Sequence, residues 1–288
     1  MVHGQILKMS IKLFVFVLTI AVFVFWQNND IVISEFEYKN SKVPLEFENF
    51  LIVHVSDLHN KRFGKNQQNI NKEIKYLDAD IIVITGDLVD RRKYNLEKAM
   101  EFIKEAVKYA PVYYVSGNHE AWSGKYDEVK QALLKEGVFV LDNESQDIVK
   151  NNSAIKILGV KDPAFLTSGY GEKTDISEIE SSLTNWSESS SLKVLLSHRP
   201  ELFEIYKDHN IDLVFSGHAH GGQFRIPFLG GLIAPNQGFF PKYTSGSYSC
   251  ENTTMFVSRG LGNSLMPIRL GNRPELIKVT LKSDRAEK

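Results

Sequence analysis

The sequence predicts a layered α/β domain that follows one membrane-spanning helix. Three observations lead to this expectation. A charge-free apolar run lies close to the N-terminus, short apolar runs alternate with longer amphipathic segments from Phe50 onward, and metal-binding residue types follow five of the apolar runs. The chain has 288 residues, of which 43% are hydrophobic and 24% charged, a balance typical of a globular protein and not of a disordered one.

The N-terminal segment 1–30 is expected to be a cytoplasmic tail followed by an uncleaved signal anchor. Residues 13–26 carry no charge and rise about 21 Å as a helix. Lys8 and Lys12 can extend their aliphatic stems to bring this run near the roughly 30 Å of a bilayer core. A cleaved signal peptide is disfavoured because no small residues mark a cleavage site near Trp26. A buried core helix is disfavoured because the run is apolar all round.

The two lysines also predict the orientation in the membrane. Basic residues precede the apolar run, which places the N-terminus in the cytoplasm and the rest of the chain outside. The expected localisation is therefore a single-pass protein of the cell membrane with the domain that follows the helix on the extracytoplasmic side. Cys250 is the single cysteine, so no internal disulfide forms and a cysteine-based zinc site is excluded. The formal net charge of −1 gives no basic field, and no nucleic-acid partner is expected.

A connector is expected over residues 31–43, with one alternating stretch typical of an edge strand, and a single catalytic domain over residues 44–288. Nearly continuous apolar runs between amphipathic segments predict strands that are covered on both faces by other layers. Polar stretches at 145–153 and 187–191, and a longer Gly/Pro/Tyr-rich stretch at 227–249, are expected to be loops. Strands are expected at 50–55, 80–85, 112–116, 155–160, 192–196, 212–215 and 254–257, and helices at 66–77, 96–109, 126–136, 176–186 and 201–207.

Five of the expected strands end in Ser or Gly and lead at once into residues that bind metals. Ligands of α/β proteins bind beyond the carboxyl ends of the strands, so these side chains should meet in one site. Serine and glycine suit such strand ends, because the chain must turn sharply there. The seven side chains concerned are Asp57, His59, Asp87, Asn118, His198, His218 and His220, and Asp90 and His119 stand in the same segments.

The donor types indicate two metal ions. Seven protein ligands are too many for one tetrahedral zinc site and offer too few oxygens for calcium, but they suit two divalent ions that share a carboxylate. Mixed imidazole and carboxylate ligation indicates Mn²⁺, Fe or Zn²⁺, with Mn²⁺ favoured. Two such ions about 3.5–4 Å apart clamp the attacking and leaving oxygens at phosphorus and lower the pKa of a bridging water. The sequence thus predicts hydrolysis of a phosphoester by metal-bridged hydroxide.

The ordered blocks DLH, GDLVD, GNHE, SHRP and GHAHGGQ resemble the motif series of the calcineurin-like metallophosphoesterase family. All five blocks occur in order between Asp57 and the residues after His220. The resemblance implies a layered β-sandwich of mixed sheets flanked by helices. The extended last block and residues 257–262 are similar to the membrane-associated bacterial branch, which includes enzymes that cleave the pyrophosphate of UDP-diacylglucosamine and other phosphodiesters.

The resemblance implies a role for each side chain of the site. His119 would face the scissile phosphate and leaving group without binding metal, and Asp90 would orient the His119 ring. Asp87 would bridge the two ions. One ion would take Asp57, His59, Asp87 and His220, and the other Asp87, Asn118, His198 and His218.

The substrate is expected to be a phosphorylated small molecule or a lipid-linked or envelope phosphodiester or pyrophosphate. A phosphomonoesterase is the alternative, and a non-catalytic metal-binding scaffold is disfavoured because His119 is retained. Arg91, Arg225 and Arg259 are candidates for contact with substrate phosphate, the alternative for each being a surface or structural role. Apolar residues between 224 and 240 form either a satellite core cluster or an exposed surface near the membrane.

Overall fold

Two six-stranded sheets pack face to face in the computed structural model, which describes residues 2–167, 174–263 and 267–285. The first sheet has the strand order β1-β16-β2-β3-β4-β5 and the second β14-β15-β9-β8-β7-β6. The first sheet comprises β1 (Val32–Asn40), β16 (Glu275–Ser283), β2 (Leu51–Val55), β3 (Ile81–Thr85), β4 (Val112–Val115) and β5 (Phe139–Val140). The second comprises β14 (Gly246–Cys250), β15 (Thr253–Val257), β9 (Leu213–Ser216), β8 (Leu192–Leu196), β7 (Ser153–Gly159) and β6 (Glu144–Lys150).

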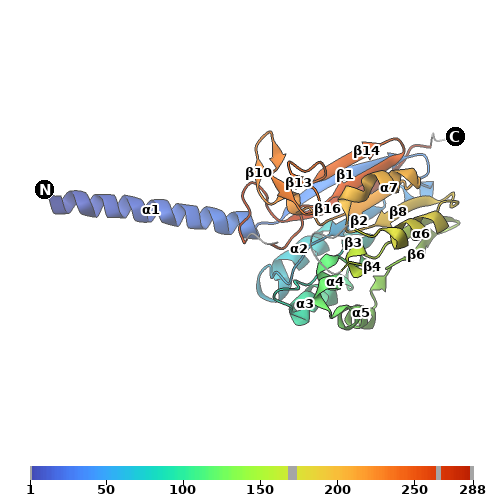
Figure 1. Ribbon diagram of the computed structural model, residues 1–288, viewed down its shortest axis with the longest axis horizontal. Coiled ribbons are helices and arrows are strands. Elements are labelled where there is room, and N and C mark those ends of the chain that lie inside the picture. The colour runs from blue at the N-terminus through green and yellow to red at the C-terminus, as the bar shows by residue number, and fades with distance from the viewer. Residues whose placement is uncertain (1, 168–173, 264–266, 286–288) are drawn as a thin grey trace.

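Helices cover the outer faces of the sandwich (Figure 1). The core between the sheets takes Ile52 and Val83 from the first sheet and Val194 and Phe215 from the second. Alternate residues of the same strands, such as Ile82, point outward and pack under the helices of the first sheet. This side has α2 (Gln68–Leu77), α3 (Leu96–Ala106), α4 (Asn118–Ser123) and α5 (Tyr126–Lys135), and the second sheet is covered by α6 (Ser177–Asn185) and α7 (Phe203–Asp208).

The predicted layered α/β sandwich with mixed sheets is thereby confirmed. Burial on both faces explains the unbroken apolar runs, because neither face of a central strand meets water. Parallel pairing joins β2, β3 and β4 in the first sheet and β7, β8 and β9 in the second. The strand ends that carry the candidate ligands therefore lie at one edge of each sheet.

One expected loop is in fact part of a sheet. Residues 145–153 form most of β6 and the start of β7, which pair antiparallel from Glu144↔Gly159 to Lys150↔Ser153. The expectation of a loop was wrong because β6 is an edge strand whose side chains are mostly exposed, so its sequence is polar. The stretch 227–249 contains short strands as well as turns. These are β11 (Gly230–Gly231), β12 (Ile233–Ala234), β13 (Gly238–Phe239) and part of β14, and β10 (Arg225–Ile226) precedes them.

The expected connector, residues 31–43, also contributes to the sheet. β1 pairs in parallel with β16 along its whole length, from Val32↔Glu275 to Asn40↔Ser283. Tyr38 of β1 is buried, and the ring of Phe36 lies 4.9 Å from that of Phe256. The partner strand β16 was missed in the sequence analysis, and with it the reason for β1 to be ordered. Only Asp30 and Ile31 separate β1 from the N-terminal helix.

The N-terminal helix α1 (Val2–Asn29) projects from the domain as one continuous helix (Figure 1). Its segment Gln5–Asn29 is long and apolar enough to cross a membrane. None of the most apolar window of this segment is buried inside the protein. The helix thus has no partner for its apolar surface among the described residues.

The pairing of β1 predicts a difference between two truncations. A chain that begins at residue 31 keeps β1 and should unfold like the full domain. A chain that begins at residue 44 should lose at least about 3 kcal/mol of unfolding free energy, because Phe36 and Tyr38 leave the core and β16 becomes an edge. Denaturant titration of both chains measures the difference. Equal stability of the two would show that residues 31–43 are a connector after all.

Candidate metal centre

The candidate ligands come from five strand ends, three in the first sheet and two in the second. Asp57 and His59 follow β2, Asp87 follows β3, and Asn118 begins α4 directly after β4. In the second sheet, His198 follows β8, while His218 and His220 follow β9. All seven side chains are buried, and the structure brings them together in the seam between the two sheets.

Tight turns place these side chains. Asp57, His59, Asp87, His218 and His220 all have positive φ angles, between 47° and 64°. A left-handed residue other than glycine costs of order 1 kcal/mol or more, although Asp and His tolerate it better than most. Backbone hydrogen bonds hold the strained turns, for example from His59 N to the Asp87 carbonyl at 2.9 Å. The sharp turns let two ligands of one segment point into the same site.

Two glycines allow the strand ends to approach closely. A Cβ on Gly217 would lie 1.9 Å from Ser56 Oγ and 2.5 Å from a carboxylate oxygen of Asp57. Gly86 has a φ of 78°, and a Cβ there would lie 2.5 Å from the backbone nitrogen of Gly117. The Gly residues that end the apolar runs are therefore required by close packing of neighbouring strand ends.

The first group of metal-capable atoms belongs to Asp57, His59, Asp87 and His220, which lie within 4.8 Å of one another. His220 Nε2 is 3.2 Å from Asp57 Oδ1 and 3.1 Å from His59 Nε2. His59 Nε2 is 3.5 Å from Asp87 Oδ2. Four donor atoms thus surround one small space.

The second group contains Asp87, His198 and His218. His198 Nε2 lies 3.3 Å from Asp87 Oδ2, 3.1 Å from Asn118 Oδ1 and 3.1 Å from His218 Nδ1. Asp87 Oδ2 is therefore close to a histidine of each group, His59 on one side and His198 on the other. The two groups share this oxygen.

The donor set fits two divalent ions. Ligand atoms about 2.0–2.2 Å from one tetrahedral ion lie about 3.3 Å from each other, and the separations within both groups are 3.1 to 3.8 Å. Asp57 Oδ1 is buried without a hydrogen-bond partner. Such an atom is costly unless a cation or a donor satisfies it. The clustered His and Asp side chains are able to bind a pair of metal ions.

The charges of the group also favour a cation. Burial raises the pKa of Asp57 and of Asp87, but the surrounding imidazoles outweigh burial and hold both pKa values well below the ordinary one. Burial lowers the pKa of His198, yet Asp87 beside it brings the pKa up to about 10. Burial lowers the pKa of His220 to about 3, so its ring is neutral and can ligate. Two buried carboxylates thus require positive charge from protons or from metal.

His119 and Asp90 lie beside this centre. The His119 ring packs edge-on against His59, with centroids 4.4 Å apart. Its Nδ1 accepts the backbone N–H of Arg91 at 3.2 Å and lies 3.6 Å from Asp90 Oδ1, beyond hydrogen-bond distance. The Asp90 carboxylate is held on both oxygens by the Arg92 guanidinium, at 3.1 and 3.0 Å. Asp90 therefore acts on the His119 ring through its charge in this structure.

Three supporting residues were missed in the sequence analysis. Glu120 is fully buried and accepts backbone N–H groups from Asp87 and Gly117 at 2.8 Å each, so it ties the β3 end to the β4 end. Arg199 is buried and paired with both oxygens of Asp162 at 2.7 and 2.8 Å. Glu120 lies two residues after Asn118 and Arg199 directly follows His198, so their positions beside ligands could have marked them in the sequence.

Asn236 is the third missed residue, and it comes from the stretch expected to be a loop. Its Oδ1 lies 3.1 Å from His218 Nε2 and 2.9 Å from Arg199 Nη1. His218 Nε2 also lies 3.0 Å from Arg199 Nη1, while its Nδ1 faces the second group. Asn236 and Arg199 thereby contact the far side of the His218 ring and help to orient its Nδ1 toward the second group. No local sequence pattern marks this residue.

The three arginines proposed to bind substrate are not gathered among the ligands. Arg91 is exposed, and its guanidinium stacks over the Trp122 ring at 4.8 Å. Arg225 donates to the Gly221 carbonyl and Arg259 pairs with Glu275 at 2.8 Å. Contact with substrate stays a prediction for each of them.

A cavity of about 500 Å³ opens at the metal-capable cluster. It is lined by His59 and Asp90 of the centre and by the cationic side chains of Lys61, Arg92 and Lys93. Asn263 and Pro267 complete the lining. The cationic border suits a phosphorylated ligand.

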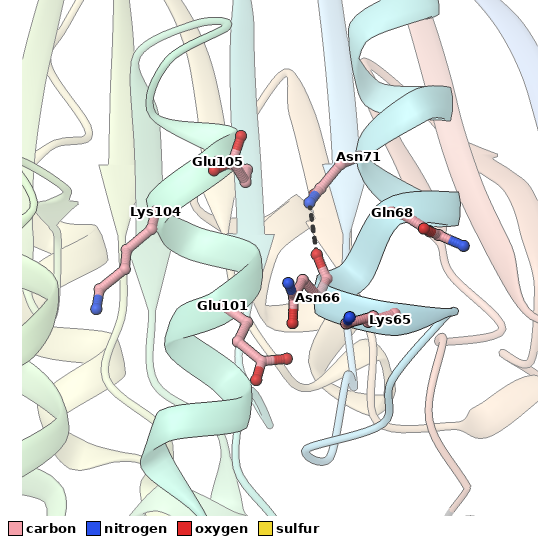
Figure 2. A pocket seen from close by; sticks show the side chains of 7 residues that line it. All are labelled: Lys65, Asn66, Gln68, Asn71, Glu101, Lys104 and Glu105. Carbon is pink, nitrogen blue, oxygen red and sulfur yellow. Dashed lines mark hydrogen bonds between the residues drawn. The ribbon is translucent and has the colours of Figure 1, made fainter.

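A second surface cavity, of about 600 Å³, lies between the start of α2 and α3 (Figure 2). Its lining mixes the cations Lys65 and Lys104 with the acids Glu101 and Glu105. Figure 2 shows the amide of Asn71 turned toward the Asn66 carbonyl, 3.4 Å away. None of the metal-capable clusters found among the described residues includes a side chain from this cavity. The cavity at His59 is the one placed for chemistry.

Comparison with known proteins agrees with this geometry. Residues 50–222 match the family model of the calcineurin-like phosphoesterases. The chain is 31% identical to "Uncharacterized metallophosphoesterase YkuE" of Bacillus subtilis (strain 168), with 87% of this chain and 85% of that protein covered. It is 27% identical to "Phosphodiesterase YaeI" of Escherichia coli (strain K12), with 85% and 84% covered. It is 26% identical to "Transmembrane protein with metallophosphoesterase domain" of Danio rerio, with 87% and 57% covered.

The chain therefore belongs to the calcineurin-like phosphoesterase family and is a metal-dependent phosphoric ester hydrolase. The family expected from the five sequence blocks is confirmed. The enzyme class follows from the matched family together with the clustered His and Asp side chains.

Loss of the Asn236 amide should weaken metal binding without unfolding the domain. We expect Asn236→Ala to lower the metal affinity roughly 10- to 100-fold, because the His218 ring loses a polar contact that orients it. Titration of the metal-free protein with Mn²⁺ in a calorimeter measures this change. Asn252→Ala, at an exposed asparagine in a turn, serves as the control and should bind like the unaltered chain. An unchanged affinity in Asn236→Ala would remove Asn236 from the centre.

Proposed function

We propose that this chain hydrolyses a phosphodiester or pyrophosphate bond of a lipid-linked or envelope substrate at the surface of the cell membrane. The observation that carries the proposal is Asp87 Oδ2, which lies 3.5 Å from His59 Nε2 and 3.3 Å from His198 Nε2. One carboxylate oxygen shared by two ligand groups supports a pair of ions and not a single one.

Each of the two ions would be held by four side chains, and Asp87 belongs to both sets. Bound ions would supply positive charge to the phosphoryl oxygens and would acidify a water molecule. We assign Mn²⁺ as the favoured metal because the ligands mix imidazole and oxygen. The first set is Asp57, His59, Asp87 and His220, and the second is Asp87, Asn118, His198 and His218.

His119 is assigned the proton transfer to the leaving oxygen. The neutral ring that accepts the Arg91 N–H at Nδ1 carries its hydrogen on Nε2 and would donate a hydrogen bond to the leaving oxygen. Transfer of the proton itself would come from the imidazolium form, which returns to the neutral ring. The Asp90 carboxylate, 3.6 Å from Nδ1, would stabilise the protonated ring by its charge. Arg92 keeps that carboxylate in place with two hydrogen bonds.

The membrane location rests on α1. This helix has the length and composition of a membrane span, and one relative bears the name of a transmembrane protein. Lys8 and Lys12 before the apolar run support a cytoplasmic N-terminus and an extracytoplasmic catalytic domain. A phosphodiester is favoured over a monoester as substrate because "Phosphodiesterase YaeI" is a relative along most of the chain.

The test of the reaction uses the full chain in detergent with Mn²⁺. We expect hydrolysis of bis-p-nitrophenyl phosphate that stops on chelation and that exceeds the rate on p-nitrophenyl phosphate. Asp87→Ala is the negative control, and it should lose both ions in elemental analysis because it bridges them. A faster rate on the monoester would instead favour a phosphomonoesterase. A protein that binds two metals yet hydrolyses neither ester would contradict the proposal.

Replacement of His119 separates metal binding from proton transfer. His119→Ala should retain two ions per chain but lose roughly 10²–10⁴ in kcat, because the leaving oxygen is no longer protonated. His209→Ala, at the residue that follows α7 and contacts Thr184 and the Ile205 carbonyl, should keep the full rate. Metal analysis and turnover with bis-p-nitrophenyl phosphate provide both measurements. An unchanged kcat for His119→Ala would overturn its assigned role.

A further inference from the structure

A group of apolar side chains is exposed on the short hairpins that follow the last metal-ligand segment. The hairpins are β10–β11 and β12–β13, each antiparallel. Phe228, at the turn between β10 and β11, is fully exposed, and Leu229, Phe239 and Phe240 are each more than two-thirds exposed. We call the side chains of Ile226, Phe228, Leu229, Phe239 and Phe240 the hairpin patch. Several large apolar side chains gathered in contact with water mark an interaction surface.

The hairpins that carry the patch, labelled β10 and β13 in Figure 1, lie at the end of the domain from which α1 emerges. A chain of contacts links the two. The side-chain oxygen of Asn28, near the end of α1, accepts the backbone N–H of Arg269 at 3.2 Å. The next residue, Leu270, pairs with Phe224 and accepts the backbone N–H of Arg225 at 3.1 Å. Arg225 begins β10, so the first hairpin starts within a few residues of the helix end.

The domain is also fixed relative to α1. Asn28 is buried at the end of the helix, and the Arg273 guanidinium lies 4.8 Å from the Trp26 ring and pairs with Asp30. Because β1 begins at Val32, no flexible connector separates the helix from the sheet. A membrane that contains α1 therefore meets this end of the domain.

The cavity of the metal centre opens at the same end. Lys61, which lines the cavity together with His59, donates its ammonium hydrogen to the Asn28 carbonyl. The residue that borders the cavity thus also binds the last turn of α1. Arg92 and Lys93 continue the cationic border. The hairpin patch, the helix end and the cavity are neighbours on one side of the domain.

We propose that the hairpin patch is a membrane-docking surface, embedded in the head-group layer of the same membrane that α1 enters. The proposal rests on the membrane anchoring proposed above. A lipid surface is the occupant that the observations favour, because the patch adjoins a helix whose own apolar surface is uncovered and whose end is bonded to the domain. The aromatic side chains suit the boundary between head groups and acyl chains.

The docking would orient the enzyme toward its substrate. With α1 and the hairpin patch as two contacts, the cationic border of the cavity faces the anionic head groups, and Arg92 and Lys93 add to that attraction. A phosphodiester at the level of the head groups could then reach the metal centre without leaving the bilayer. Lipid-borne diesters are accordingly the substrate class that this surface selects.

Site-directed fluorescence measures the docking in the full chain. In a Cys250→Ser background, a thiol-reactive NBD fluorophore is attached at Phe228→Cys in the patch, Leu18→Cys in α1 or Val149→Cys on the remote edge strand β6. Each protein is reconstituted into vesicles of phosphatidylethanolamine and phosphatidylglycerol that carry nitroxide-labelled lipids. Val149 is a matched control because it is a large apolar side chain that is 67% exposed.

We expect strong quenching at position 18 and quenching at position 228 at least about threefold above that at position 149, because a docked side chain lies 5–10 Å inside the head-group boundary. Quenching at 18 with none at 228 would overturn the docking surface and leave the anchor standing. No quenching at 18 would overturn both. A blue-shifted but unquenched label at 228 would show that a second protein copy covers the patch, which also overturns the proposal.

Activity provides an independent readout. Phe228→Ser combined with Phe239→Ser should slow hydrolysis of a diacylglycerol p-nitrophenyl phosphate in the same vesicles at least about fivefold, since the two rings no longer hold the cavity against the lipid. The rate on soluble bis-p-nitrophenyl phosphate should be unchanged, which shows that the metal centre is intact. Equal rates on the lipid diester for the double variant and the unaltered chain would contradict the docking surface. If the unaltered chain hydrolyses neither the lipid diester nor the soluble diester, the result would instead contradict the proposed function.

Discussion

Two buried carboxylates, Asp57 and Asp87, set the constraint on which the rest of the structure depends. Both lie in the seam between the sheets with almost no exposure to water. A buried carboxylate is costly unless positive charge and hydrogen bonds surround it. Ser56 and the backbone N–H of His218 bind one oxygen of Asp57, and the backbone N–H of His119 binds Asp87 Oδ1. The other oxygen of each carboxylate, Asp57 Oδ1 and Asp87 Oδ2, lies near the histidines. Two metal ions bound there would supply the positive charge.

The sandwich architecture is what gathers that charge. Parallel strands in both sheets deliver their carboxyl ends to the same seam, so ligands separated by more than 160 residues, such as His59 and His220, come within 3.1 Å. Left-handed turns at five of the ligands are stabilised by the contacts that the cluster itself provides, and close-packed glycines leave room for them. The pairing of β1 with β16 continues the first sheet to within two residues of the N-terminal helix. The metal centre, the cavity and the proposed lipid-facing surface therefore share one frame.

The sequence predicted the fold class and the candidate metal ligands of this protein, because metal ligands depend on a few residue types at strand ends. The buried strands were recognisable from their unbroken apolar runs, and the blocks around Asp57, Asp87 and Asn118 identified the family. Polar edge strands gave no comparable signal, so β6 was taken for a loop. The alternating stretch of β1 was visible, but whether it was ordered depended on its pairing with β16, a strand about 240 residues away in sequence. Pairing at such distance is decided by tertiary packing and not by local pattern.

The sequence by itself thus determined the fold class, the enzyme family and the set of side chains able to hold metal, since these follow from residue type, spacing and hydrophobic periodicity. The tertiary structure alone decided three further matters. It showed that Asp87 Oδ2 lies between the two ligand groups, that Asn236 fixes the His218 ring, and that the helix end, Lys61 and the exposed hairpins adjoin one cavity. Each depends on contacts between segments far apart in the chain, and distances across a packed interior are set by the fold as a whole.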